Sequence, residues 1–267
     1  MKIACQDSLI PGKTLLDKLH KLRDYGFEGV ELLGSGLREN HREAEEALDK
    51  VDVPVAAICA GYRSVVLEAD PDLRDQAISD CKTLLSIAGD LGAVGLIFVP
   101  IHGRPRIGDL QPLHTVVELE MMLLLKILQD LGEHAEKAKT LILLEPLNRY
   151  ETHLLKRLEQ AVDVCQQVGN PNLHIMADFF HMSIEEADIP GSIRAAGSYI
   201  SHVHLADSNR LLPGHGHTDF RAGFAALAEV GFDKYMSLEC SVPGQADVEL
   251  PKCVQYLKSC RPTSSGR

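Results

Sequence analysis

Four stretches in the C-terminal half decide the fold: LILLEP (141–146), LHIMADFF (173–180), ISHVHLAD (200–207) and YMSLEC (235–240). Each is short and apolar, which is typical of a strand that is covered on both faces. Each also carries one side chain of a metal-binding type at or near its C-terminal end, namely Glu145, Asp178, His204 and Glu239. These residues follow one another at intervals of 33, 26 and 35 positions, the length of one strand and one helix. We therefore predict parallel strands whose carboxyl ends meet and form a divalent-metal site.

The same pattern of strand and helix extends to the N-terminus. Four more apolar stretches each precede a segment with helical spacing of its apolar residues: KIACQ, FEGVELL, VPVAAICAG and VGLIFVP. Eight such units around one core predict a (β/α)8 TIM barrel, and the 267 residues match the roughly 250 that are typical of this fold. An open, doubly wound sheet is disfavoured, because no GxGxxG motif follows the first strand. We expect one domain over residues 1–260 and a polar, disordered tail, RPTSSGR, over residues 261–267.

Composition narrows the classes of protein. The chain has 27 basic and 38 acidic residues, whereas a duplex-binding enzyme needs a basic surface, so we expect no nucleic-acid partner. No apolar run reaches the roughly 18 residues of a membrane span, and the first strand follows Met1 directly, so neither membrane association nor a signal peptide is expected. The seven cysteines contain no CxxC motif, which predicts neither a disulfide framework nor a thiolate zinc site. A reduced, cytoplasmic protein is the simplest interpretation.

The four candidate ligands are three carboxylates and one imidazole. This mostly oxygen set suits Mn²⁺, Co²⁺ or Mg²⁺, and Zn²⁺ is also possible. A glutamate at a strand end could instead pair with an arginine, and a single histidine is more often a core residue. Burying three carboxylates together is strongly unfavourable unless a cation compensates them, so the metal site is the preferred interpretation.

Three further residues lie close to this set in the sequence: Glu151, His181 and Arg210. Arg210 has a forked set of donors that could hold a substrate oxygen, or it could form a salt bridge. His181 could donate a hydrogen bond to a carbonyl oxygen or protonate it, or it could make only a contact at a helix start. His202 precedes His204 by two positions and points the same way, one layer lower in the barrel. We expect a buried polar residue or a support for the site, with metal ligation as the alternative.

Two loops carry the remaining candidate site residues. The loop after the fourth strand carries His102, Arg104 and Arg106, which could contact substrate or remain solvated. His215 and His217 lie in a glycine-rich loop after the seventh strand, where the same two interpretations apply.

Several segments together resemble a known family: GFEGVEL, LLEPLNRYET, ADFFHMSIEE, HVHLADSNRLLPGHGHTDF and SLEC. The chain resembles the xylose-isomerase-like barrel superfamily, and within it the ketose 3-epimerases such as D-tagatose and D-psicose 3-epimerase. The resemblance covers nearly the whole chain and is strongest over residues 140–240. It implies that Glu145, Asp178, His204 and Glu239 bind the metal, most often Mn²⁺, and that Glu145 and Glu239 are the acid and base. It also implies that Glu151, His181 and Arg210 contact a sugar. We further expect a homo-oligomer, a dimer or a tetramer.

The chemistry that fits such a site is proton abstraction next to a carbonyl. Two carboxylates that flank one carbon would epimerise a ketose at C3 through a cis-enediolate, so we predict an isomerase of this kind. A 1,2-aldose–ketose isomerisation needs one face only, so a hydroxypyruvate- or inosose-type isomerase or dehydratase is the alternative. An apurinic-endonuclease-like phosphodiesterase would need more histidines on the third and fourth strands. A binding protein that has lost catalysis would have no need of both glutamates.

Overall fold

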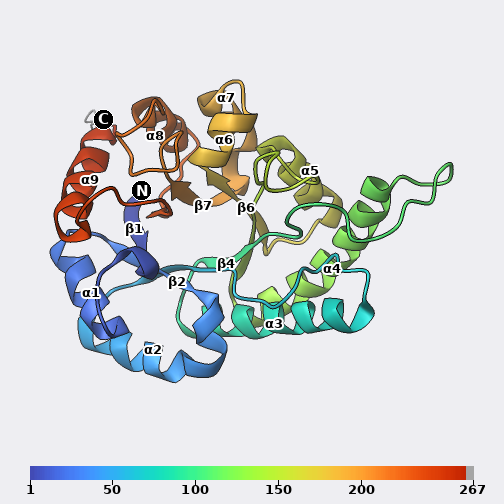
Figure 1. The fold of residues 1–267 in the computed structure, drawn as a ribbon, viewed down its shortest axis with the longest axis horizontal. Coiled ribbons are helices and arrows are strands. Elements are labelled where there is room, and N and C mark those ends of the chain that lie inside the picture. The colour runs from blue at the N-terminus through green and yellow to red at the C-terminus, as the bar shows by residue number, and fades with distance from the viewer. Residues whose placement is uncertain (263–267) are drawn as a thin grey trace.

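A closed barrel of eight parallel strands forms the centre of the computed structural model, which describes residues 1–262 (Figure 1). The strand order follows the chain, and β8 pairs with β1 to close the barrel. This confirms the predicted (β/α)8 TIM barrel. The strands are β1 Lys2–Gln6, β2 Gly29–Leu33, β3 Val55–Cys59, β4 Gly95–Phe98, β5 Leu141–Leu144, β6 Leu173–Asp178, β7 Ile200–Leu205 and β8 Tyr235–Leu238.

Helices surround the strands in chain order, as Figure 1 shows. They are α1 Leu15–Asp24, α2 Leu37–Val51, α3 Pro71–Asp90, α4 Val116–Ala138, α5 Leu158–Val168, α6 Phe179–Glu185, α7 Ile189–Ala196, α8 Phe220–Glu229 and α9 Ala246–Cys260, with short 3-10 turns at Asp7–Leu9, Gly34–Gly36 and Gly197–Tyr199. None of the helices between residues 1 and 262 combines the length and apolar character that a membrane span requires. The predicted tail over residues 261–267 falls outside the described residues from 263 onward, so the division into one domain and a tail stays a prediction.

Two apolar layers hold the barrel together. The larger layer packs the outward side chains of the strands against the helices, with Ile142, Leu84 and Leu128 among its fully buried members. A smaller cluster fills the barrel interior: Ala57, Cys59, Ile97, Leu143 and Met176. Filled interiors are typical of TIM barrels, so chemistry is confined to the barrel ends.

The segment 173–180 corrects one detail of the sequence analysis. The apolar stretch LHIMADFF reads as a strand to its end, but β6 ends at Asp178 and α6 begins at Phe179. The Asp178 carboxylate accepts hydrogen bonds from the backbone N–H groups of Phe180 (2.6 Å) and His181 (3.4 Å). An aspartate at this position caps a helix and satisfies its free N–H groups, so it ends the strand despite the apolar residues that follow.

Two glycines allow the loops after β2 and β3 to meet at the carboxyl end of the barrel. A Cβ atom on Gly34 would lie 2.1 Å from the carbonyl oxygen of Ala60, and a Cβ atom on Gly61 would lie 2.2 Å from the carbonyl carbon of Gly34. Gly61 also has a φ of 101°, which favours glycine. The two loops therefore pack backbone against backbone beside the site described next.

Candidate metal centre

The carboxyl ends of strands β5 to β8 bring the four predicted ligands together. Glu145 directly follows β5, Asp178 ends β6, His204 lies near the end of β7, and Glu239 directly follows β8. The strand register aligns them, because Asp178 lies opposite His204 across β6 and β7. One possible ligand atom from each of the four residues lies within 4.8 Å of all the others. The predicted convergence at the carboxyl end is therefore present in the structure.

The imidazole of His204 tests whether this cluster suits a cation. Its Nδ1 is buried and has no hydrogen-bond partner among the described residues. This nitrogen lies 3.4 Å from Glu239 Oε2 and 3.8 Å from both Glu145 Oε1 and Asp178 Oδ2. Three carboxylates around one unpartnered imidazole nitrogen are a donor set for a divalent cation. The residues present thus fit the metal that the sequence predicts.

Charge in the cluster leads to the same conclusion. Burial and the carboxylates of Glu239 and Asp178 hold the pKa of Glu145 well above its ordinary value. Burial also disfavours ionisation of Asp178, but His181 and His204 outweigh it and lower the pKa of that carboxyl. Carboxylates this close and this buried need a proton or a cation to compensate their charge.

A carboxylate from the other half of the barrel supports His204 from behind. Glu31, in β2, is fully buried, and the Nε2 atom of His204 lies 2.9 Å from its Oε1. His202 Nε2 lies 2.6 Å from Glu31 Oε2, one layer below the ligands. Although burial opposes ionisation, His204 and His202 lower the pKa of Glu31. A carboxylate on Nε2 leaves Nδ1 of His204 free to face the cluster, the usual arrangement behind a metal-binding histidine.

Gln6, at the end of β1, links this support to the ligands. Its Nε2 donates to Glu31 Oε1 at 2.9 Å and to Glu239 Oε1 at 3.0 Å. The two hydrogens of one amide group thus orient a supporting carboxylate and a candidate ligand. The sequence analysis missed both Gln6 and Glu31. The available signal was weak: Glu31 is the only charged residue in the strand GVELL.

Arg210 lies at the rim of the cluster. Its Nη1 donates to Glu151 Oε1 at 2.9 Å, its Nη2 donates to Glu239 Oε2 at 3.2 Å, and its guanidinium lies 4.7 Å from the ring centroid of Phe180. The residue has a φ of 60°, which is uncommon for arginine, in a turn closed by its N–H donating to the carbonyl of Asp207. Arg210 therefore makes ion pairs with Glu151 and Glu239, and its guanidinium stays partly exposed.

His181 approaches the cluster from the first turn of α6. Its Nε2 lies 3.6 Å from Asp178 Oδ2 and 3.9 Å from Glu145 Oε1, and the ring is buried. Glu151, His181 and Arg210 thus surround the four candidate ligands. Their contact with a sugar stays a prediction.

The loop residues that the sequence analysis singled out do not join the candidate ligands. His102, Arg104 and Arg106 are exposed in the loop after β4, and His215 and His217 are exposed in the loop after β7. None of these five residues belongs to the cluster of candidate ligands. Burial lowers the pKa of His102, which also interacts with the charges of Glu151 and His181. Any role of these five residues toward a substrate stays a prediction.

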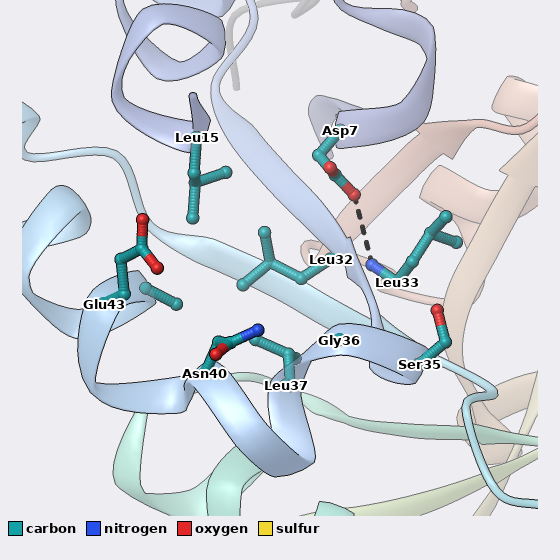
Figure 2. A pocket seen from close by; sticks show the side chains of 10 residues that line it. Asp7, Leu15, Leu32, Leu33, Ser35, Gly36, Leu37, Asn40 and Glu43 are labelled. Carbon is teal, nitrogen blue, oxygen red and sulfur yellow. Dashed lines mark hydrogen bonds between the residues drawn. The ribbon is translucent and has the colours of Figure 1, made fainter. Parts of the chain in front are cut away.

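A separate cavity of about 350 Å³ lies between α1 and α2. Figure 2 shows Leu15 and Leu32 directed into it, with Asn40 and Glu43 at its side. Leu32 follows Glu31 in β2, and alternation directs it outward, away from the barrel interior. This cavity therefore lies outside the barrel wall, and it shares no residue with the candidate metal centre.

Comparison with known proteins assigns the chain to a family. The family model described as "Xylose isomerase-like TIM barrel" matches residues 19–260. The chain is 26% identical over 263 residues to 3-dehydro-D-guloside 4-epimerase of Escherichia coli strain K12, which spans 97% of this chain and 100% of that protein. It is 38% identical over 111 residues to D-psicose 3-epimerase of Ruminiclostridium cellulolyticum, which spans 42% of this chain and 38% of that protein. These relatives are sugar epimerases, which are enzymes of the isomerase class.

Solved structures agree over the whole length. The crystal structure of 3-keto-D-glucoside 4-epimerase from E. coli, in its apo form, has a TM-score of 0.89 and 26% identity, and covers 97% of this chain and 100% of that chain. The structure of D-psicose 3-epimerase with D-tagatose from Clostridium cellulolyticum H10 has a TM-score of 0.84 and covers 97% of this chain and 99% of that chain. Its identity is 22%, so it shows the similarity of fold alone.

Proposed function

We propose, from the premise that this chain belongs to the xylose isomerase-like TIM barrel family, that it is a metal-dependent sugar epimerase that inverts a carbon next to a ketone. One observation carries the proposal: Glu145 follows β5 and Glu239 follows β8, so two carboxylates from separate strands meet in one cluster that can hold a cation. Inversion needs a proton removed from one face of a carbon and another delivered to the opposite face. Two carboxyl groups from two strands supply that pair.

The cation would be held by Glu145, Asp178, His204 and Glu239. When bound, it would supply Lewis-acid polarisation of the sugar carbonyl. Glu145 and Glu239 exchange protons with the carbon, one as base and the other as acid. Arg210 orients Glu239 through a 3.2 Å hydrogen bond and offers its exposed donors to a substrate oxygen. His181 and Glu151 bind further substrate oxygens at the rim.

Two substrate classes fit this reaction. The first is a free ketose inverted at C3, as the names of the D-psicose 3-epimerases indicate for those relatives. The second is a 3-keto sugar of a glycoside inverted at C4, and the match over 100% of the 3-dehydro-D-guloside 4-epimerase favours it. In both classes the inverted carbon lies next to a ketone, so the same two glutamates suffice. A 1,2-aldose–ketose isomerisation, which needs one face only, is distinguished by a carbonyl that moves along the chain.

Three finer features belong to the proposal. Mn²⁺ is the cation we expect, because the donor set is mostly oxygen with one nitrogen. A cytoplasmic location is supported by the seven cysteines, all of which are free in the structure. A homo-oligomer, a dimer or a tetramer, is the assembly we expect.

The test is solvent deuterium exchange followed by NMR. The Mg²⁺-loaded protein is incubated in D₂O with ketoses and with 3-keto-glucosides, and the carbon that acquires deuterium identifies the substrate class. Glu145→Gln and Glu239→Gln, each with its metal content measured, should both abolish epimerisation. One variant should still exchange the α-proton of one epimer, and the other variant should exchange the α-proton of the other epimer. Glu229→Gln, which alters an exposed ion pair on α8, is the matched control and should remain active. Near-normal epimerisation by either metal-loaded site variant would show that the substituted glutamate is not one of two required bases, and would overturn the two-base reaction.

A further inference from the structure

We infer that Asn148, in the loop after β5, is a positioning residue that fixes which ring nitrogen of His181 carries the proton, so that His181 hydrogen-bonds a substrate oxygen and does not protonate it. This inference deepens the proposed function and rests on it for the identity of the substrate oxygen. Asn148 has no charge and is 1% exposed. Its effect comes entirely from the direction of its hydrogen bonds.

The orientation of the Asn148 amide is set by the backbone. The N–H group of Tyr150 donates to Asn148 Oδ1 at 2.9 Å, in the side-chain turn that asparagine commonly forms with the residue two positions on. A backbone N–H group can only donate, so the atom facing it has to be the oxygen. The other end of the amide is therefore Nδ2, which carries two hydrogens and accepts none.

Both hydrogens of Nδ2 are directed at groups of the candidate site. Nδ2 lies 2.9 Å from Glu151 Oε1 and 2.8 Å from His181 Nδ1. The backbone N–H group of Asn148 also points at His181 Nδ1, at 3.2 Å. The Nδ1 atom of His181 thus faces two donors and has to be the unprotonated, accepting nitrogen.

The tautomer of His181 follows from these contacts. A neutral imidazole carries one proton, so the proton of His181 lies on Nε2. Nε2 is the atom that faces the candidate ligands, 3.6 Å from Asp178 Oδ2 and 3.9 Å from Glu145 Oε1. A ring that gave this proton to substrate would keep none, while its Nδ1 would still face two donors. His181 therefore acts as a fixed hydrogen-bond donor, and proton transfer is left to Glu145 and Glu239.

The same amide couples His181 to the rim. Glu151 Oε1 accepts from both Asn148 Nδ2 and Arg210 Nη1, each at 2.9 Å. Three residues that we propose to contact the sugar are therefore linked through one buried asparagine. An aspartate in its place keeps the shape and the bond from Tyr150, but presents an acceptor where Nδ2 donates. It would repel Glu151 and favour the proton on Nδ1 of His181.

The first experiment reads the tautomer directly. Long-range ¹H–¹⁵N NMR spectra of ¹⁵N-histidine-labelled, Mg²⁺-loaded protein distinguish protonated from unprotonated ring nitrogens, and the His181 signals are those lost in His181→Gln. We expect unprotonated Nδ1 and protonated Nε2. A proton on Nδ1 in the unaltered protein would overturn the inference. The spectrum is recorded without turnover, so its result does not depend on whether the protein catalyses the proposed epimerisation.

The second experiment is Asn148→Asp, compared with Asn170→Asp. Asn170 forms the same side-chain turn, with Oδ1 accepting from the N–H of Asn172 at 2.8 Å, at the opposite end of the barrel. In Asn148→Asp we expect the His181 proton to move to Nδ1 and kcat/KM to fall by about tenfold to a hundredfold, the cost of losing one buried hydrogen bond. Asn170→Asp should change neither. An Asn148→Asp protein that retains the native His181 spectrum would show that the side chain does not set the tautomer.

Discussion

The two halves of the barrel contribute different chemistry to one site. Strands β5 to β8 present the candidate ligands, whose oxygen and nitrogen atoms face a common point. Strands β1 to β3 present Gln6, Glu31 and Cys59, which lie behind those ligands; Cys59 Sγ is 3.9 Å from Glu239 Oε1. One half therefore forms the centre and the other orients it. The difference teaches that a polar side chain at the carboxyl end of a barrel strand is not by itself a candidate ligand, because Gln6 and Cys59 also end their strands.

Loss of a candidate ligand in the C-terminal half should have the largest effect. His204→Ala removes the only nitrogen of the donor set. It also leaves Gln6 as the remaining hydrogen-bond partner of Glu31 Oε1. We expect specific divalent binding to disappear in calorimetric titration, together with activity. A chelator should inactivate the unaltered protein, and added Mn²⁺ should restore it. If His204→Ala still bound one cation tightly, the proposal that these four residues of the C-terminal half hold the metal would be wrong.

Arg210→Ala tests the rim of the same half. If its donors hold a substrate oxygen, kcat/KM should fall about a hundredfold or more, the effect of removing one donor aimed at developing charge. The melting temperature should change little, because partly exposed ion pairs contribute little stability. Arg194→Ala, which breaks an exposed pair with Glu229, is the control and should leave kcat/KM unchanged. A fall in activity that only follows a fall in melting temperature would make Arg210 a structural residue.

Glu31→Gln tests the orienting half. Removing the carboxylate behind a metal-binding histidine typically costs tenfold to a hundredfold in metal affinity, so we expect a loss of about that size in calorimetric titration. Glu28→Gln is a matched control in the segment just before β2, since Glu28 accepts from the N–H of Ile3 and does not contact the cluster. Equal metal affinity in Glu31→Gln and the unaltered protein would show that the two halves are not coupled.

The smallest effect on activity is expected at Asp80, which serves stability within the N-terminal half. Its buried carboxylate accepts from Arg63 Nε and Nη2, each at 2.9 Å. Burial opposes ionisation, but Arg63 and Arg38 lower the pKa of Asp80 to about 2.

Because the folded-state pKa of Asp80 lies below the unfolded value of about 3.9, its contribution of about 2 kcal/mol is present at neutral pH and is lost as pH falls from about 4 to about 2. Asp80→Asn should therefore be less stable than the unaltered protein at pH 7, and the difference should shrink over that range in chemical unfolding curves. Its kcat should be unchanged. A stability difference as large at pH 2 as at pH 7 would exclude ionisation as the cause.

The sequence by itself determined the barrel and the set of candidate ligands. Apolar strands alternating with amphipathic helices define eight units, and a polar residue at the carboxyl end of such a strand lies at the mouth of the barrel wherever the strand stands. Glu145, Asp178, His204 and Glu239 could therefore be placed without knowing any contact. The prediction that the sixth strand extends to Phe180 was wrong. Asp178 caps the following helix by accepting a hydrogen bond from the N–H of Phe180, and this local bond outweighs the apolar pattern.

Only the tertiary structure decided which groups orient these ligands. Barrel closure brings Glu31 within 2.9 Å of His204, although 173 positions separate them in the chain. Asn148 and His181 meet across 33 positions, and the direction of one amide decides which ring nitrogen carries the proton. A sequence pattern records which face of a strand a residue occupies. It does not record the register between strands or the direction of a hydrogen bond, and those set the chemistry of this site.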